Sequence, residues 1–204
     1  MSSNDQERAF KLVAGHPALD LVNTLDWRFR ESGTEELLAS YDDLLRFAAQ
    51  TELLSAKQVR QVMRAAADIA AADTLVACRE LREAAAEVFY SAADQRTPAA
   101  APVKMVQRFF NEARKHQRLA WTGERLTWEW TPADIGAELP LWVLSLSVTR
   151  LLLSEEMQRL RACENDECRW LFLDTSKNHT KRWCDMRLCG NRMKARRYKA
   201  QHGG

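Results

Sequence analysis

The spacing of apolar residues changes along the chain, and each change predicts a different element. Between residues 73 and 94, apolar side chains such as Leu75 and Val88 recur at helical spacing in a segment rich in Ala, Arg and Glu. This pattern predicts a helix with one buried stripe. Cys78 falls on that stripe, and we interpret it as a small core residue. Residues 103–116 return to the same period and predict a second amphipathic helix.

Two further helices are predicted from their N-terminal signals. Ser40 precedes an apolar-periodic segment and has Asp43 three residues later, and Ser55 has Gln58 at the same distance. Both pairs are typical of a capping box. Residues 15–28 mix turn residues with an apolar run that is too short for periodicity to decide, so we expect a strand or a loop there.

The period changes from helical to alternating in residues 119–130, LAWTGERLTWEW. Alternation around a Thr-Gly-Glu turn predicts a β-hairpin with an aromatic face. The tryptophans Trp121, Trp128 and Trp130 are expected to pack on helices, because packing explains them more simply than stacking on nucleobases.

Residues 139–161 are largely apolar and predict a long buried helix that ends where a cysteine-rich segment begins. Its most apolar part, residues 139–153, contains Arg150 and is shorter than the roughly 20 residues of a membrane span. We therefore expect two domains, 1–160 and 161–204. The predicted fold class is α+β, a mostly helical body with a small β-hairpin followed by a small cysteine-rich module.

Charge is distributed unevenly between these two parts. Residues 1–160 hold 19 Lys and Arg against 23 Asp and Glu, whereas residues 161–204 hold 11 against 5. A basic segment joined to a mildly acidic body is expected where one end of a protein meets a polyanion. A tail that only increases solubility is the alternative.

Four cysteines in the basic part form two matched pairs. Four residues separate Cys163 from Cys168, fifteen follow, and four separate Cys184 from Cys189. Zinc accepts a tetrahedron of thiolates, and a short turn can present two sulfurs to one ion. Four thiolates leave no position open for water, so we predict one structural zinc ion.

Two disulfides or four unrelated thiols would be the alternatives for these cysteines. The first ten residues are polar and charged and lack the pattern of a secretory signal, which indicates a cytoplasmic protein. In a reducing cytosol, closely spaced cysteines are metal ligands more often than disulfides.

The order of elements expected in the finger is knuckle, hairpin, knuckle and helix. Residues 170–173 suit a strand, 176–178 a turn, and a second strand would then reach Trp183. Cys189 would lie at the beginning of the terminal helix, as in a treble-clef or ribbon-type finger.

The terminal segment is the candidate nucleic-acid surface. It has six basic residues and no acidic ones from Met186 to the end, and its few apolar residues predict that the helix projects from the body. Asn191, Arg192 and Gln201 have groups that could read purine bases. The candidate nucleic-acid-binding residues are Arg182, Arg187, Asn191, Arg192, Lys194, Arg196, Arg197 and Lys199.

The body has no motif typical of an enzyme: we find no phosphate-binding loop, no HExxH pair and no nucleophile elbow. A candidate ligand site comprises His16, Asp20 and Asn23, which interrupt an apolar run. Backbone capping is the simpler explanation for these three side chains.

The sequence resembles a known family at both ends. The segments WLFLDTSKN, KRWC and CGNRMKARRY, with CGNR at residues 189–192, resemble the CGNR zinc finger. Residues 15–24, GHPALDLVNT, are similar to the opening of the ABATE domain, which accompanies this finger in bacterial stress-induced transcription regulators. Asp185 departs from the small polar residue expected at its position.

The resemblance implies a zinc-dependent DNA-binding protein that regulates transcription, with double-stranded DNA as its partner and no membrane. It also implies a sensing or dimerising body, which leaves a small-molecule effector and a homodimer open. The alternative is a ligand-binding or enzymatic body with the finger as an RNA- or protein-docking module.

Overall fold

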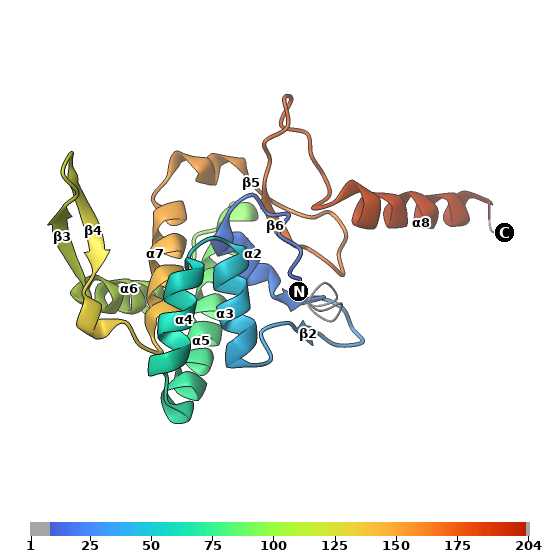
Figure 1. Cartoon of the computed structure of the whole chain (residues 1–204). Helices are drawn as coiled ribbons and strands as arrows, with labels where there is room; N and C mark the ends of the chain where they lie inside the picture. The colour runs from blue at the N-terminus through green and yellow to red at the C-terminus, as the bar shows by residue number, and fades with distance from the viewer. Residues whose placement is uncertain (1–8, 203–204) are drawn as a thin grey trace.

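The computed structural model describes residues 9–202, and this part of the chain is mostly helical (Figure 1). Its α-helices are α2 (Pro17–Asn23), α3 (Tyr41–Gln50), α4 (Ala56–Ala65), α5 (Asp68–Ala93), α6 (Ala100–Lys115), α7 (Leu139–Leu152) and α8 (Asn191–His202). The strands form antiparallel pairs, β1 (Leu25–Asp26) with β2 (Glu35–Glu36), β3 (Gln117–Trp121) with β4 (Leu126–Trp130), and β5 (Leu160–Ala162) with β6 (Leu171–Leu173). Short helical turns are η1 (Pro132–Asp134), η2 (Glu155–Arg159) and η3 (Met186–Gly190). The predicted α+β class is confirmed.

The core lies where α5, α6 and α7 pack together and α2 and α3 cover them. Phe47 on α3, Phe89 on α5 and Leu144 on α7 are fully buried. The stripe predicted for residues 73–94 is the buried side of α5, and Cys78 lies on it with no exposed surface. Its role as a core residue is therefore confirmed.

Both predicted capping boxes are present. The Ser40 hydroxyl accepts from the Asp43 N–H at 3.2 Å, and Asp43 accepts from the Ser40 N–H at 2.8 Å. Ser55 and Gln58 make the same reciprocal pair at the start of α4. Each pair satisfies N–H groups that have no partner within the helix.

The segment expected to be a strand or a loop begins instead with helix α2. Pro17 occupies the first turn, where a missing N–H costs nothing, and the His16 ring accepts from the Ala18 N–H at 3.1 Å. Only Leu25–Asp26, at the end of the segment, form a strand.

The helix predicted for residues 139–161 ends earlier, at Leu152. The hydroxyl and the N–H of Ser154 both bond to the Leu151 carbonyl, at 2.8 and 2.9 Å, and close the last turn. The chain then forms η2 and enters β5. Among the described residues, no helix is both long enough and apolar enough to cross a bilayer.

The predicted hairpin is formed by β3 and β4. The expected packing of its tryptophans on helices holds for Trp130, is partial for Trp128, whose ring centre lies 3.6 Å from Arg114 of α6, and is wrong for Trp121. Trp130 is partly buried and lies 5.8 Å from the Trp142 ring of α7. Trp121 and Trp128 are 65% and 50% exposed. A five-residue strand rises about 16 Å, so the hairpin extends beyond the helices that its base contacts.

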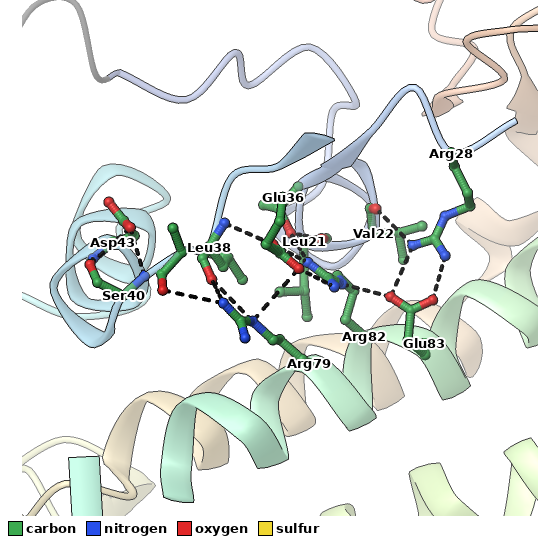
Figure 2. A network of polar contacts seen from close by, with 12 residues as sticks. Leu21, Val22, Arg28, Glu36, Leu38, Ser40, Asp43, Arg79, Arg82 and Glu83 are labelled. Atoms are coloured by element: carbon green, nitrogen blue, oxygen red, sulfur yellow. Dashed lines mark hydrogen bonds and ion pairs between the residues drawn. The ribbon is translucent and has the colours of Figure 1, made fainter. Parts of the chain in front are cut away.

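A network of ion pairs fixes the β1–β2 segment on α5 (Figure 2). Arg82, only 3% exposed, donates to both carboxylate oxygens of Glu36, at 2.6 and 2.7 Å, and to Glu83 at 2.8 Å. Arg28 also pairs with Glu83. Burial alone would raise the pKa of Glu83, but the Arg28 and Arg82 guanidiniums outweigh it and lower that pKa. The network positions Trp27, which comes between β1 and Arg28 and contacts the finger.

The finger and the body share a hydrophobic core. Leu160, Leu171 and Leu173 belong to the same buried cluster as the helices of the body. The boundary expected between residues 160 and 161 falls inside β5. The finger is therefore continuous with the body at this point.

Candidate metal centre and nucleic-acid surface

The four cysteines of the finger come from two separate loops and meet at one point. Cys163 and Cys168 lie between β5 and β6, Cys184 precedes η3, and Cys189 lies within it. All four are free thiols with at most 4% of their surface exposed. Their sulfur atoms lie within 4.8 Å of one another. The two separate pairs are thus assembled into one buried cluster.

The sulfur spacing fits zinc. The distance from Cys168 Sγ to Cys184 Sγ is 3.7 Å, and from Cys184 Sγ to Cys189 Sγ it is 3.8 Å. A tetrahedron with zinc–sulfur bonds of about 2.3 Å has edges of about 3.8 Å, whereas a disulfide would bring two sulfurs to about 2.05 Å. The predicted ligand set is confirmed as a site for one structural zinc ion.

The first loop is closed by Asn165. Its carbonyl accepts from the N–H groups of Cys168 and Arg169, both at 2.9 Å, and Arg169 completes the turn with a φ of 46°. The side-chain amide of Asn165 is fully buried and donates to Cys189 Sγ at 3.6 Å. Such a hydrogen bond to a ligand atom orients the ligand. Asn165 therefore links the two halves of the site, a role that the cysteine spacing did not reveal.

Hydrogen bonds among the four sulfurs shift the pKa values of the cysteines in opposite directions, lowering those of Cys163 and Cys189 and raising those of Cys168 and Cys184. Hydrogen bonds from Cys168 and Cys184 lower the pKa of Cys163 to about 7. Hydrogen bonds from the other three thiols, Cys163 first, also lower the pKa of Cys189. Zinc binds all four sulfurs as thiolates, so binding of the metal would release protons from this cluster.

The second loop is a tight turn that leads directly into the terminal helix. Asp185 Oδ1 accepts from the N–H groups of Arg187 and Leu188, at 2.6 and 3.3 Å. A Cβ at Gly190 would lie 2.3 Å from Met186 Sδ and 3.2 Å from the Trp183 ring. A side chain at this position would therefore displace the exposed Met186 side chain and crowd the Trp183 ring. The predicted position of this last ligand at the start of the helix is confirmed.

The second strand expected before Trp183 is absent from the described residues. Buried Asp174 instead accepts from the N–H groups of Ser176 and Lys181, both at 2.9 Å, and so closes residues 174–181 into a loop. The partner of β6 is β5, on the other side of the first cysteine pair.

The terminal helix α8 projects away from the body (Figure 1). Its base is fixed by two contacts: Arg192 lies 4.7 Å from the centre of the Trp27 ring, and Arg196 pairs with Glu167 at 2.8 Å. Tyr198, farther along, is 65% exposed. The helix is thus attached near its start and surrounded by solvent beyond it.

Some of the candidate nucleic-acid-binding residues contact other residues of the described part, and others form no ion pair there. Arg182 pairs with Glu164, while Asn191 donates to the Arg187 carbonyl at 3.3 Å. The side chain of Arg197 lies outside the described part. Four exposed candidates, Arg187, Arg192, Lys194 and Lys199, form no ion pair with an acidic residue of the described part, and Arg192 lies against the Trp27 ring.

The candidate ligand residues of the body make hydrogen bonds to backbone groups. His16 caps α2, and Asp20 accepts from the N–H groups of Val13 and Ala14, each at 3.1 Å. Asn23 donates to the Leu171 carbonyl and accepts from its N–H, both at 3.0 Å. Backbone bonding accounts for all three, and the Asn23 pair joins the body to the finger.

A cavity of about 530 Å³ lies at this junction. Arg28, Tyr90 and Arg169 are among its lining residues, and none of the three ligand candidates is. The Tyr90 hydroxyl donates to the Arg169 carbonyl at 3.1 Å, and Arg169 pairs with Asp94 at 2.6 Å. The first zinc loop is therefore held on α5 by both its backbone and a side chain.

Comparison with known families agrees with this geometry. Residues 159–202 match the CGNR zinc finger, and residues 15–155 match the ABATE family, described as "putative stress-induced transcription regulator". The description names a regulator and not an enzyme. No curated protein matches the chain. Since the ABATE match covers more than half of the sequence, the chain belongs to the ABATE family and carries a CGNR zinc finger at its C-terminal end.

Proposed function

We propose that the protein is a zinc-dependent DNA-binding transcription regulator in which the body holds the finger and α8 contacts the duplex. The observation that carries this proposal is the projection of a basic helix directly from the zinc cluster. Such a regulator works where the bacterial chromosome lies, so the proposal includes a cytoplasmic location and a role in the stress response.

The position of the charge supports contact with phosphates. Arg187, Lys194 and Lys199 are exposed on η3 and α8, and α8 itself contains no acidic residue. Cations that neutralise phosphates release counterions, which supplies affinity without regard to sequence. These three residues are the ones we expect to bind the backbone of the duplex.

The basic residues of α8 that contact other side chains of the protein have a different role in this proposal. Arg196 and Arg192 hold the base of α8 against Glu167 and Trp27. Their replacement would change the direction of the helix as well as its charge. A test of DNA contact should therefore use the exposed cations and leave these contacts intact.

The test is a salt titration of duplex binding by a variant with Arg187→Ala, Lys194→Ala and Lys199→Ala. Each lost phosphate contact lowers the slope of log affinity against log salt by about 0.9, so we expect a slope smaller by about 2.7 and weaker binding at every salt concentration. Fluorescence anisotropy with a labelled duplex measures both.

The control variant carries Lys57→Ala and Arg60→Ala, which remove two exposed cations from α4. It should bind the duplex as the wild type does. An unchanged slope in the triple variant would refute the assignment of α8. Stronger binding to structured RNA or to a single strand than to the duplex would favour the RNA-docking alternative.

A further inference from the structure

A cavity of about 780 Å³ lies where the first described residues, the β1–β2 segment and the finger meet. Phe10, Trp27 and Trp170 are among its lining residues, and we call these three the aromatic wall. Trp27 and Trp170 also pack in the buried cluster of the zinc-binding cysteines. Cavities of this size with aromatic walls and a few polar groups are typical sites for small molecules.

Two carboxylates of this cavity face each other without a cation between them. Asp26 of β1 is directly opposite Glu35 of β2, and both line the cavity. Among the described residues, neither forms an ion pair. Burial raises the pKa of Asp26, and the charge of Glu35 adds to the rise. Like charges directly opposite each other destabilise a strand pair, so a cation placed between these carboxylates would be stabilising.

The other charged groups of the lining leave the cavity with an excess of negative charge. Glu36 accepts from Arg82 (Figure 2), and Asp43 pairs with Arg46, so these two acids have their own partners. Lys11 also lines the cavity, and its charge opposes the rise in the pKa of Asp26. It is exposed, however, and in the described part it forms no ion pair with either of the opposed carboxylates. An anionic ligand is therefore disfavoured.

Trp170 adds a hydrogen-bond donor to the same part of the cavity. Its side chain is 94% buried, and its indole N–H has no hydrogen-bond partner among the described residues. The indole lies close enough to Asp26 to lower the pKa of that carboxyl. A buried donor without a partner is unfavourable, so this N–H favours a ligand that brings an acceptor atom with its positive charge.

We propose that this cavity binds a small organic amine that also carries an oxygen acceptor. The ammonium group lies between Asp26 and Glu35, the oxygen accepts from the Trp170 N–H, and the apolar part of the ligand packs on the aromatic wall. This site is distinct from the cavity at Arg169 and from His16, since neither residue lines it.

The position of the cavity connects such a ligand to the finger. The Trp170 carbonyl accepts from the N–H of the zinc ligand Cys163 at 2.9 Å. The Trp27 ring lies 4.7 Å from the guanidinium of Arg192, at the base of α8. An amine that contacts both tryptophans would therefore change the position of α8. Its effect on DNA rests on the proposed function, whereas its binding does not.

Calorimetric titration of the full-length, zinc-loaded protein tests the site. The probe is phenylalaninol, which has an ammonium group, a hydroxyl and an aromatic ring, and it should bind at one site per chain. Phenethylamine lacks the hydroxyl and should bind more weakly. Phenylpropanol lacks the amine and should show no saturable binding.

Two conservative variants locate the bound amine. Asp26→Asn and Glu35→Gln should each weaken phenylalaninol binding about tenfold or more, because a hydrogen bond to a charged group is lost. Asn at position 26 keeps an oxygen acceptor for the Trp27 N–H, which Asp26 accepts at 2.7 Å, and Glu35 is exposed, so both variants should fold. The matched control is Glu31→Gln, an exposed acid between β1 and β2 that does not line the cavity and should bind as the wild type does.

Three results would overturn the proposal: no saturable binding of phenylalaninol at millimolar concentration, equal binding of phenylpropanol, or unchanged affinity in both variants. Fluorescence anisotropy with a labelled duplex separates this inference from the proposed function. Phenylalaninol should change the duplex affinity of the wild type and not that of Asp26→Asn. A protein that binds phenylalaninol but no duplex would support the site and refute the proposed function, and a protein that binds the duplex but no amine would refute the site alone.

Discussion

Single buried polar residues fasten backbone groups of other segments of this protein. Asn23 bonds the backbone of Leu171 through both ends of its amide. Asp20 uses one carboxylate oxygen to fasten the N–H groups of Val13 and Ala14. Asp20 is only 6% exposed, and burial raises its pKa from 3.8 to about 6, although the two backbone bonds oppose this. Its ionisation therefore affects the stability of the fold.

The pKa of Asp20 predicts a fall in stability as the pH rises. Below pH 3.8 the carboxyl is protonated in both states, and between pH 3.8 and about 6 it ionises first in the unfolded chain. Above about pH 6 the carboxylate is ionised in both states, and its burial in the folded state lowers the free energy of unfolding by up to about 3 kcal/mol. We expect Asp20→Asn, which keeps an oxygen acceptor, to remove this part of the pH dependence in urea unfolding.

Asp73→Asn is the control, because Asp73 is an exposed acid on α5. It should leave the pH dependence as in the wild type. If Asp20→Asn retained the same loss of stability between about pH 4 and about pH 6, Asp20 would not be its source.

Helices and strands that are marked by a pattern within one short segment were predictable from the sequence. Elements that depend on contacts with distant residues were not. The capping boxes at Ser40 and Ser55 and the alternation in residues 119–130 each lie within one short segment. The loop after β6 depends instead on Asp174, whose bonds to Ser176 and Lys181 replace the expected strand. Short apolar segments carry too little periodicity to reveal such competition.

The sequence also did not predict that the outer part of the hairpin is exposed. Alternation predicts which residues share a face, and that part of the prediction holds for Trp121, Trp128 and Trp130. It does not say how far the strands extend beyond the helices underneath. Two of the three tryptophans are exposed for this reason.

The ion-pair network between β2 and α5 predicts a large effect of one neutral substitution. Glu36→Gln would leave the nearly buried Arg82 guanidinium with only Glu83 as an anionic partner. Loss of one partner from a buried pair typically costs 3 to 5 kcal/mol, so we expect a decrease of about 3 kcal/mol in the free energy of unfolding. Urea denaturation measures it.

A surface pair supplies the comparison. Glu112 and Lys115 lie 2.6 Å apart with side chains 52% and 67% exposed, and Glu112→Gln should change the stability by less than about 0.5 kcal/mol. Equal effects of the two substitutions would show that burial of Arg82 does not matter.

For the whole molecule, the zinc ligands were predictable from the spacing of the cysteines. The residues that hold the finger in place were not predictable. The four cysteines stand out because two matched pairs occur in one segment. Asn165, Trp27 and Glu167 act on the finger through the folded chain, and no motif distinguishes them in the sequence. The same is true of the core that the finger shares with the body.

This shared core predicts that loss of zinc also weakens the helical body. Leu171 and Leu173 are buried in the core of the body, and the Leu173 N–H donates to the Ala14 carbonyl at 2.8 Å. We expect Cys184→Ser, or removal of zinc by a chelator, to leave much of the helical circular dichroism at low temperature. The Tm of the body should nevertheless fall by about 10 °C, as for a loss of about 3 kcal/mol in a chain of this length.

Cys78→Ala is the matched control, because this cysteine is buried on α5 outside the cluster. It should retain one zinc per chain by elemental analysis. Re-addition of zinc should restore the Tm of the chelated wild type. An unchanged Tm of the body after zinc removal would show that the two parts unfold independently.

Within the described part of the chain, the contacts that attach α8 lie in its first two turns, and the helix can therefore act as a lever. Twelve residues at about 1.5 Å each give a length of about 18 Å, so a tilt of about 10° at the base would displace the far end by about 3 Å. That displacement is close to the separation of successive base pairs, about 3.4 Å. Small adjustments where Cys189 and Trp27 meet the helix would therefore decide which phosphates its outermost cations reach.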